Sequence, residues 1–457
     1  MALTFDESVY ASQVGKHAVA TMFTAPRARG MPWLLAPVAG ITTSIFALRV
    51  YLTLLASVLL YVAFQPWIAT TSRDRRIYSY VPAVAAACFA SLWITILYGP
   101  MAYPNLWLTF ALVGGLGYFC QAVTVRSGAI WRPLTWVVVA FAAAATIRPT
   151  DALAAAVPLL LFPVVIRGSN RLAPAMAVLG GLALGWSSWI VEAYVRFGGP
   201  LQRLKDGAEI NSGGLAFTIG KNLDALDGPR LLCLQPSWCA GVDVTTALWW
   251  FALPVLVAIG LYAARRTGWL PYASLAVASA LFASVQYLFL INYAAPRFLL
   301  PAYGLLAIPA AAGLIWLVAR PQQWARILAG SLALLVFIAH LRVQGQVLAS
   351  AEDRLQETAR QVAAQARFLR EEGIERPCLV WGQGAIQLSY LLKCRSQLGI
   401  GAARGSAEQA ILAARERGDH VVVELGAYAR VPEFLSSWRR VGLPGTKDYV
   451  VYIPRGQ

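Results

Sequence analysis

Long apolar segments separated by short polar ones make up most of the first three quarters of the chain. Each is close to the twenty or so residues that an α-helix needs to cross a bilayer, so the pattern predicts about ten membrane-spanning helices. The predicted spans are Thr43–Phe64, Ile77–Tyr98, Asn105–Val123, Trp131–Thr146, Thr150–Ile166, Leu172–Val195, Thr246–Ala264, Leu270–Ile291, Phe298–Val318 and Trp324–Leu341. The fourth and fifth are short and separated only by Ile147-Arg148-Pro149, so one broken helical hairpin is the alternative there.

Composition supports a membrane protein, because 58% of the 457 residues are hydrophobic and only 13% are charged. The net charge of +16 would suggest nucleic-acid binding in a soluble protein, but here arginine collects in every second short loop. Those loops hold eleven arginines and one acid, Asp74: Arg73, Arg75, Arg76, Arg126, Arg132, Arg167, Arg171, Arg265, Arg266, Arg320 and Arg326. The positive-inside rule makes this side cytoplasmic. Residues 1–32, the loop 196–245 and the chain after Leu341 are then predicted to be extracytoplasmic.

The amino-terminal region conflicts with this topology, because residues 1–32 are predicted outside although no span precedes them. Either the terminus is translocated as a tail, or a preceding transmembrane helix is missing from this chain; we favour the missing helix. Residues 32–41 are apolar but short and contain Pro37, which predicts an interfacial or re-entrant helix. Residues 1–42 are therefore interpreted as a first extracytoplasmic segment with interfacial helices.

After the last predicted span the pattern becomes that of a soluble protein. The predicted domains are a transmembrane helical domain over 43–342, a polar connecting helix over 343–373, and a soluble domain over 374–457. Strands are predicted at Cys378–Trp381, 397–400, His420–Leu425 and Tyr449–Ile453, and helices at Ile386–Lys393, Ala407–Arg417 and Pro432–Arg440. Alternating strands and helices indicate a small parallel α/β domain. The turn Gly382-Gln-Gly-Ala is too short a match to a phosphate-binding loop to predict a nucleotide site.

Four of the six cysteines lie in regions predicted to be extracytoplasmic. Cys233 and Cys239 share the loop 196–245, and Cys378 and Cys394 share the soluble domain. An oxidising compartment permits disulfides, so the pairs Cys233–Cys239 and Cys378–Cys394 are predicted. Histidines are not near either pair, which makes a metal site there a weak interpretation.

The candidate chemistry lies at the predicted outer ends of the spans. Asp6 and Glu7 are adjacent acids and the candidate catalytic pair. Asp6 could accept the proton of an acceptor hydroxyl as a general base, and Glu7 could orient the acceptor or the Asp6 loop. The simpler interpretation is a pair of acids in a first helical turn. Arg148 and Arg297 could bind a phosphate, or could be basic side chains snorkelling to the interface. Asp151 could be a helix N-cap, and Asp151, Glu192 and Lys16 are candidates for an acceptor-binding residue or a second acid. Glu192 could instead be only an interfacial residue.

Three stretches together resemble the GT-C superfamily of polytopic glycosyltransferases, which includes protein O-mannosyltransferases and the lipid A aminoarabinose transferase. They are Phe5-Asp6-Glu7 with Tyr10, Arg148-Pro149-Thr150-Asp151, and Asn292-Tyr-Ala-Ala-Pro-Arg297-Phe-Leu-Leu-Pro-Ala-Tyr303. The resemblance implies a polytopic α-helical membrane protein with a small extracytoplasmic α/β domain. It departs from the superfamily at the amino terminus, where a first transmembrane helix should stand.

The resemblance also implies an activity. The expected enzyme is an inverting glycosyltransferase of a bacterial cytoplasmic membrane, which moves a hexose or pentose from a polyprenyl-phosphate carrier to a glycan, lipid or protein acceptor. A divalent metal is left open as a cofactor. The alternatives are a transporter or flippase of a lipid-linked glycan, which would need midplane charges and an internal repeat, and a plain membrane anchor for the soluble domain.

Overall fold

The protein is seen in a computed structural model that describes residues 3–16, 19–71, 76–125, 129–165, 172–228, 231–233, 241, 243–319, 322–382, 384–397 and 404–455. It forms two compact units. The helical unit comprises Ala25–Gly30 and Leu52–Glu352, and the sheet unit comprises Met1–Thr24, Met31–Tyr51 and Asp353–Gln457. The amino-terminal segment with the paired acids thus belongs to the same unit as the carboxy-terminal domain.

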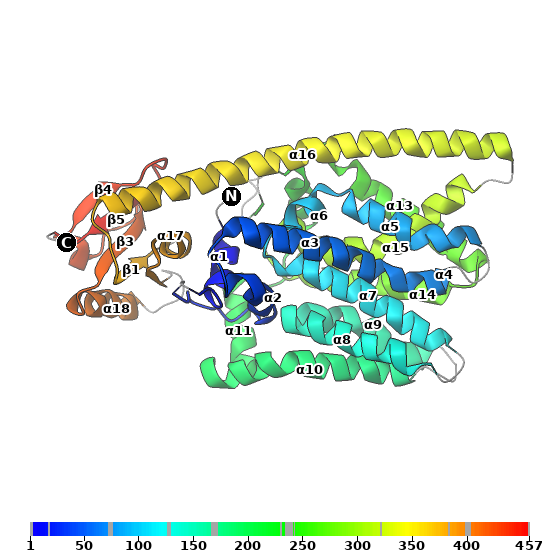
Figure 1. Ribbon diagram of the computed structural model, residues 1–457, viewed down its shortest axis with the longest axis horizontal. Helices are drawn as coiled ribbons and strands as arrows, with labels where there is room; N and C mark the ends of the chain where they lie inside the picture. Colours follow the sequence, from blue (N-terminus) through cyan, green and yellow to red (C-terminus); the bar gives the residue numbers. More distant parts are fainter. Residues whose placement is uncertain are drawn as a thin grey trace. The chain divides into compact units, whose positions relative to one another are not determined.

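The helical unit is built almost entirely of helices (Figure 1). Two of its helices, α3 and α16, also continue into the sheet unit. In chain order the elements are α3 (Ile45–Phe64), η1 (Gln65–Trp67), α4 (Ile68–Thr71), η2 (Arg76–Tyr80), α5 (Val81–Ala90), α6 (Trp93–Tyr98), α7 (Pro104–Thr124), α8 (Trp131–Ile147), α9 (Pro149–Val165), α10 (Leu172–Arg196), α11 (Pro200–Ile210), α12 (Ile219–Asp224), η3 (Ala225–Asp227), α13 (Val244–Arg266), α14 (Leu270–Phe289), η5 (Pro296–Leu299), α15 (Leu300–Val318) and α16 (Gln323–Glu371).

Among the described residues, seven helical stretches are long and apolar enough to cross a membrane, by length and composition. They are Ile45–Thr71, Pro104–Thr124, Leu172–Arg196, Val244–Arg266, Leu270–Phe289, Pro296–Val318 and Gln323–Glu371. The predicted spans at 77–98, 131–146 and 150–166 correspond to shorter apolar helices. The chain is therefore a multi-pass membrane protein.

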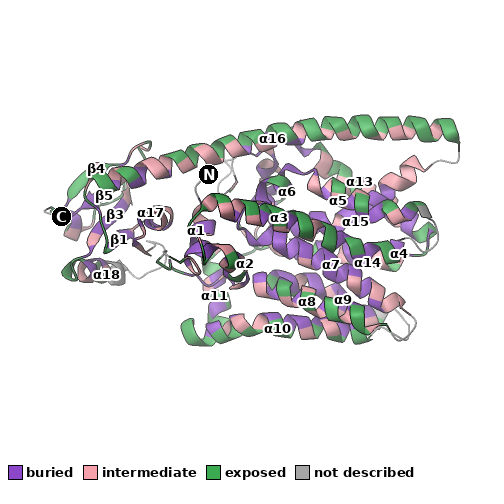
Figure 2. Ribbon diagram, in the orientation of Figure 1, coloured by how far each residue is buried: buried purple, intermediate pink, exposed green. Residues whose placement is uncertain are grey.

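Helices α7 and α15 form the centre of the helical unit, and the membrane-length windows of these segments are 78% and 83% buried (Figure 2). Small residues let neighbouring helices approach closely. A Cβ atom at Gly313 of α15 would lie 2.4 Å from the Leu256 carbonyl oxygen of α13. On α10, Gly181 and Gly185 give the same close approach to α8, where a Cβ at Gly185 would meet the Ala142 carbonyl oxygen at 2.4 Å. Bulkier residues at these positions would separate the helices.

The predicted span Ile77–Tyr98 is wrong as one continuous helix. The structure divides it into η2, α5 and α6, with a break after Ala90. The freed backbone N–H of Trp93 donates to the side-chain oxygen of Gln344 on α16, at 2.9 Å. Ser91 also makes a hydrogen bond of 3.1 Å with His340 of α16. Polar side chains of a neighbouring helix thus compensate for the backbone bonds that the break costs.

A second difference concerns the last predicted span and the connecting helix over 343–373. They are a single helix, α16, which has no break between its apolar and polar parts. None of its most apolar window is buried, and it appears mostly green in Figure 2. An unpacked apolar window of this length is typical of a helix surrounded by lipid.

The sheet unit combines the two ends of the chain. Its elements besides parts of α3 and α16 are α1 (Phe5–Ser12), α2 (Gly30–Ala39), β1 (Cys378–Trp381), α17 (Ala385–Leu392), β2 (Arg395–Gln397), α18 (Arg404–Glu416), β3 (His420–Gly426), η6 (Glu433–Leu435), β4 (Arg439–Gly442) and β5 (Tyr449–Ile453). The strand order is β2-β1-β3-β5-β4. Strands β1, β2 and β3 pair in parallel, whereas β5 pairs antiparallel with both β3 and β4.

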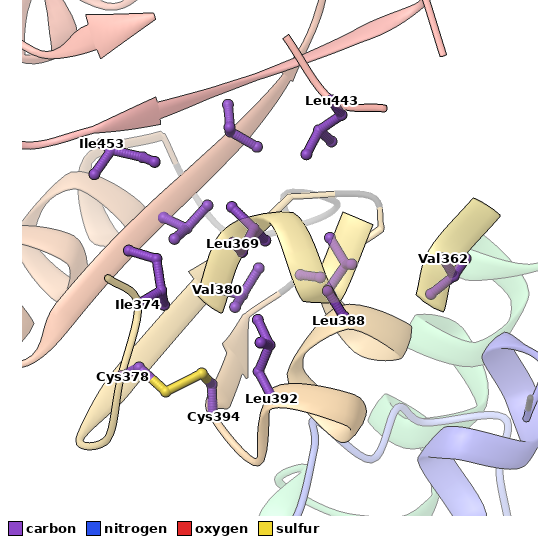
Figure 3. Close-up of a cluster of buried hydrophobic side chains, with 14 residues drawn as sticks. Val362, Leu369, Ile374, Cys378, Val380, Leu388, Leu392, Cys394, Leu443 and Ile453 are labelled. Atoms are coloured by element: carbon purple, nitrogen blue, oxygen red, sulfur yellow. A yellow bond between two sulfur atoms is a disulfide. The ribbon is translucent and has the colours of Figure 1, made fainter. Parts of the chain in front are cut away.

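The prediction of an α/β domain is confirmed, but a purely parallel sheet is wrong. The helix predicted at Pro432–Arg440 is also wrong, because this stretch forms the short turn η6 and then enters strand β4. Leu435 and Trp438 of this stretch are buried against one face of the sheet with Ile411 of α18. Leu369 of α16 and Leu388 of α17 pack on the other face with Val380 (Figure 3). The sheet is therefore covered on both faces.

Candidate active site

Glu7 is a fully buried acid at the start of α1. Its carboxylate accepts hydrogen bonds from the backbone N–H and the hydroxyl of Thr4, at 3.0 and 2.9 Å. Arg49 of α3 donates to both carboxylate oxygens, with 2.9 Å between Nη2 and Oε2. This capping box and two-pronged ion pair fix the first turn of α1. Glu7 therefore has a clear structural function.

Asp6, the neighbouring acid, is only half-buried. It lies in the first turn of the helix that the Glu7–Arg49 pair fixes, so the direction of its side chain depends on that pair. The sheet domain also contacts this helix: α1 packs against α17, and the Gln387 side chain donates to the Leu3 carbonyl oxygen at 3.1 Å. Both contacts lie within the sheet unit and constrain where Asp6 can be.

Arg148 and Asp151 form an ion pair across the turn between α8 and α9, with 2.6 Å between Nε and Oδ2. Asp151 is buried and is the third residue of α9 rather than its N-cap. The Tyr287 hydroxyl donates to Asp151 and accepts from Arg148, each at 2.5 Å, and Gln286 donates to the other oxygen of Asp151. These contacts hold α9 against α14.

Arg297 lies in η5, the short turn that leads into α15, and is half-buried. Its guanidinium lies 4.5 Å from the ring centre of Tyr103 and 5.2 Å from that of Phe298. The Phe298 ring in turn stacks on Tyr287 at 4.6 Å. Arg297 is thus connected to Arg148 through aromatic rings.

The arginine–aromatic network, as we call this group, brings together two arginines that are 149 positions apart. Its members are Tyr103, Arg148, Asp151, Gln286, Tyr287, Arg297 and Phe298. Within it, Asp151 balances the charge of Arg148, whereas Arg297 lies against ring faces. Aromatic faces orient a guanidinium and leave it able to bind a phosphate bidentately. The contacts with Tyr103 and Phe298 therefore orient the Arg297 guanidinium.

Glu192, the other candidate acid, is nearly buried at the end of α10. Its carboxylate accepts from Arg203 at 2.9 Å, from Arg29, and from Arg196 at 3.2 Å. Arg203 is fully buried and also donates to the carbonyl oxygens of Ala25, Arg27 and Trp189. These bonds tie α10, α11 and the chain before α2 together, which indicates a structural role for Glu192. Lys16 is exposed.

The disulfide Cys378–Cys394 is confirmed, and it joins the start of β1 to the residue before β2 (Figure 3). Cys233 is buried and disulfide-bonded, but Cys239 lies outside the described residues, so its pairing stays a prediction. Cys88 and Cys120 are free thiols.

The turn after β1, which loosely resembles a phosphate-binding loop, is occupied by a side chain of the protein itself. The Glu424 carboxylate of β3 accepts the N–H of Gly384 at 2.5 Å, at the start of α17. A Cβ atom at Gly382, whose φ is +139°, would lie 2.6 Å from that of Glu424. Burial raises the pKa of Glu424 above its ordinary value of 4.5, although the Gly384 hydrogen bond lowers it in part. An internal acid where a phosphate would bind argues against a nucleotide site.

Metal ligands do not assemble in the part of the chain that the structure describes: no group of three or more His, Cys, Asp or Glu side chains there could hold a metal ion. The divalent metal left open from the sequence stays untested.

Sequence reasoning missed Arg49, Tyr287 and Tyr103. Arg49 carried a usable signal, since it is a lone charge in a predicted span and such residues usually have a partner or a function. Tyr287 and Tyr103 carried none, because aromatic residues are common near span ends. Only the fold shows that they join the two arginines.

The fold of this chain is similar to the folds of ArnT and AglB, which are GT-C membrane glycosyltransferases. ArnT from Cupriavidus metallidurans, bound to undecaprenyl phosphate, matches with a TM-score of 0.64 and 11% identity, over 99% of this chain and 94% of that chain. The oligosaccharyltransferase of Archaeoglobus fulgidus, tethered with an acceptor peptide, matches with a TM-score of 0.55 and 11% identity, over 92% and 64%.

A further structure of the Archaeoglobus fulgidus enzyme AglB, with an inhibitory peptide and a dolichol-phosphate, matches with a TM-score of 0.52 and 12% identity, over 92% of this chain and 65% of that one. No protein-family model matches the chain, and no curated protein matches it by sequence. The predicted GT-C fold is confirmed. At these identities the likeness concerns the fold alone, and the activity has to be argued from the site.

Proposed function

We propose that this protein is an inverting glycosyltransferase that moves a sugar from a polyprenyl-phosphate carrier to an acceptor hydroxyl outside the cytoplasmic membrane. The acceptor oxygen attacks the anomeric carbon, the bond from that carbon to the phosphate oxygen breaks, and polyprenyl phosphate leaves. Asp6 takes the proton of the hydroxyl, which makes the oxygen a better nucleophile as the new bond forms. No step requires a further reactant.

Arg297 would bind the carrier phosphate and stabilise the charge that grows on it as the sugar leaves. Its ring contacts with Tyr103 and Phe298 keep the guanidinium in place before the donor arrives. Arg148 would act mainly through the network, since it is already paired with Asp151. The observation that carries the proposal is this pre-oriented Arg297, within a fold shared over 99% of the chain with a protein that binds undecaprenyl phosphate.

The other residues take positioning roles in this proposal. Glu7, paired with Arg49, would orient the turn that bears Asp6, while Asp151, Glu192 and Lys16 remain further candidates for contact with the acceptor. The sheet domain and the loop 196–245 would lie on the outer side of a bacterial cytoplasmic membrane. A reporter fused after Gln457 should be active only outside the cytoplasm, and cytoplasmic activity would overturn that topology.

The proposed activity is tested by incubating the purified protein with undecaprenyl phosphate carrying a radiolabelled hexose or pentose and with membrane extracts as acceptor. We expect label to move into the acceptor fraction and undecaprenyl phosphate to be released. Arg297→Ala should reduce both donor binding and transfer. Movement of the intact donor across vesicles, with no transfer by the wild type, would instead establish the transporter or flippase alternative.

A further inference from the structure

Asn105, at the start of α7, is fully buried, yet neither atom of its side-chain amide has a hydrogen-bond partner among the described residues. Its backbone oxygen is engaged, because the Thr109 hydroxyl donates to it at 2.8 Å. Buried polar groups in native proteins are nearly always paired, since an unpaired one loses its bonds to water and gains none. An amide of this kind marks a place where a ligand or an ordered water binds.

The position of Asn105 follows from two contacts on either side of it. Tyr103, just before α7, lies against Arg297 of η5, and Thr109, further along α7, faces Gly304 of α15. The two segments therefore run in the same direction. Asn105 is one helical turn before Thr109 and on the same face, which places it beside η5 and the first turn of α15. It also lies two residues after Tyr103, the network residue whose ring contacts the Arg297 guanidinium.

The hydrogen-bonding groups of the amide limit which class of ligand can bind to it. Asn105 offers two N–H donors and one carbonyl acceptor, and all three are neutral. A phosphate could accept from the donors but could give nothing to the carbonyl oxygen. A sugar hydroxyl both donates and accepts, so neighbouring hydroxyls would satisfy the whole amide. Two more buried donors in this region, the indole N–H groups of Trp93 on α6 and Trp107 on α7, also have no partner in the described part of the chain.

We propose that Asn105 binds the hydroxyl groups of the sugar while that sugar is still attached to the carrier phosphate at Arg297. Asn105 would then determine which sugar the enzyme accepts, whereas Arg297 recognises the carrier whatever sugar it bears. A site built to hydrogen-bond a substrate hydroxyl discriminates strongly against ligands that lack it. This assignment rests on the proposed function and adds to it the residue that recognises the sugar.

The test compares undecaprenyl phosphate with a panel of undecaprenyl-phosphate hexoses and pentoses as ligands of the full-length protein. We expect the wild type to bind one glycosylated carrier more tightly than the bare carrier. Asn105→Leu, which has nearly the same volume and no polar atoms, should bind undecaprenyl phosphate as the wild type does. It should lose the preference for the glycosylated carrier by about tenfold or more.

Thermal unfolding separates this role from a structural one. Removing an unpaired buried amide should leave the midpoint of Asn105→Leu unchanged or raise it. Asn222 is the matched control, because it is also buried but donates to the Thr218 and Tyr287 carbonyl oxygens at 2.9 and 3.2 Å. Asn222→Leu should therefore lower the midpoint. Trp269→Phe removes a buried, unpartnered indole N–H from the opposite, predicted cytoplasmic end and should not change donor binding.

Two results would overturn the assignment of Asn105 alone. One is an Asn105→Leu protein that keeps the full preference for the glycosylated carrier, which would mean that only water pairs with the amide. The other is a fall in its midpoint like that of Asn222→Leu, which would show a structural amide. If the wild type binds neither the bare carrier nor any glycosylated carrier, the proposed function itself is wrong, and this assignment is wrong as a consequence.

Discussion

The start of α1 and the arginine–aromatic network both combine acids and arginines, and in each a charged residue of a buried ion pair can be compared with another of the same charge in a different environment. At α1, Glu7 is buried and paired with Arg49, whereas its neighbour Asp6 is half-buried. In the network, Arg148 is paired with buried Asp151, whereas Arg297 lies against aromatic rings. Two charged residues of the same sign can thus have different surroundings. One belongs to a buried ion pair, and the other is half-buried, at the start of α1 or against aromatic rings.

The largest expected effect is on stability at α1. Removing one partner of a buried ion pair leaves the other unpaired and typically costs about 3–5 kcal/mol. Glu7→Ala and Arg49→Ala should each destabilise the protein by about that amount, and the double variant by less than the sum. Thermal and denaturant unfolding in detergent would measure this. If the three variants unfold like the wild type, the pair does not hold α1 in place.

A smaller effect should distinguish the two arginines of the network. Arg297→Ala should weaken binding of undecaprenyl phosphate by about tenfold to a hundredfold, the value of a charge-assisted hydrogen bond. Arg148→Ala should change this affinity less and should lower stability, because it removes the arginine that pairs with buried Asp151. Isothermal titration and thermal unfolding of both variants provide the comparison. Equal losses of affinity would mean that both arginines contact the phosphate.

The smallest effect concerns Glu424, whose carboxylate holds the start of α17, the helix that contacts α1. Because burial raises its pKa, the folded protein binds this proton more tightly than the unfolded chain does. The free energy of unfolding should therefore fall as the pH rises from about 4.5 through the raised pKa. Glu424→Gln should remove this contribution and flatten the profile in that window. An unchanged profile would show that the carboxylate is ionised in the folded protein at little cost.

Much of this architecture could be predicted from the sequence, because its signals are local. The length of the apolar segments predicted most of the spans, and the closeness of the two cysteines in the sequence predicted the disulfide Cys378–Cys394. The broken helix depends on a distant partner. The interruption after Ala90 is tolerated because Gln344, 251 positions from Trp93, accepts a backbone hydrogen bond. Local patterns contain no information about such a partner.

Prediction of the candidate site from the sequence is limited in the same way. The sequence marks Asp6, Glu7, Arg148, Asp151, Glu192 and Arg297 as charged residues near predicted span ends, but not which of them have partners. Arg49 lies 42 positions from Glu7, and Tyr287 lies 136 from Asp151. Burial and pairing depend on packing between distant helices, so these ion pairs become visible only in the fold.

The most direct test of the central claim is the single-turnover rate of sugar transfer by Asp6→Asn, with Glu7→Gln beside it. If Asp6 is the general base, its replacement should slow transfer by about a hundredfold to ten-thousandfold while donor binding and unfolding stay close to wild type. Glu7→Gln should mainly lower stability, because it weakens the pair with Arg49. An Asp6→Asn protein that transfers sugar at the wild-type rate would contradict the account and reduce Asp6 to an acid at a helix start.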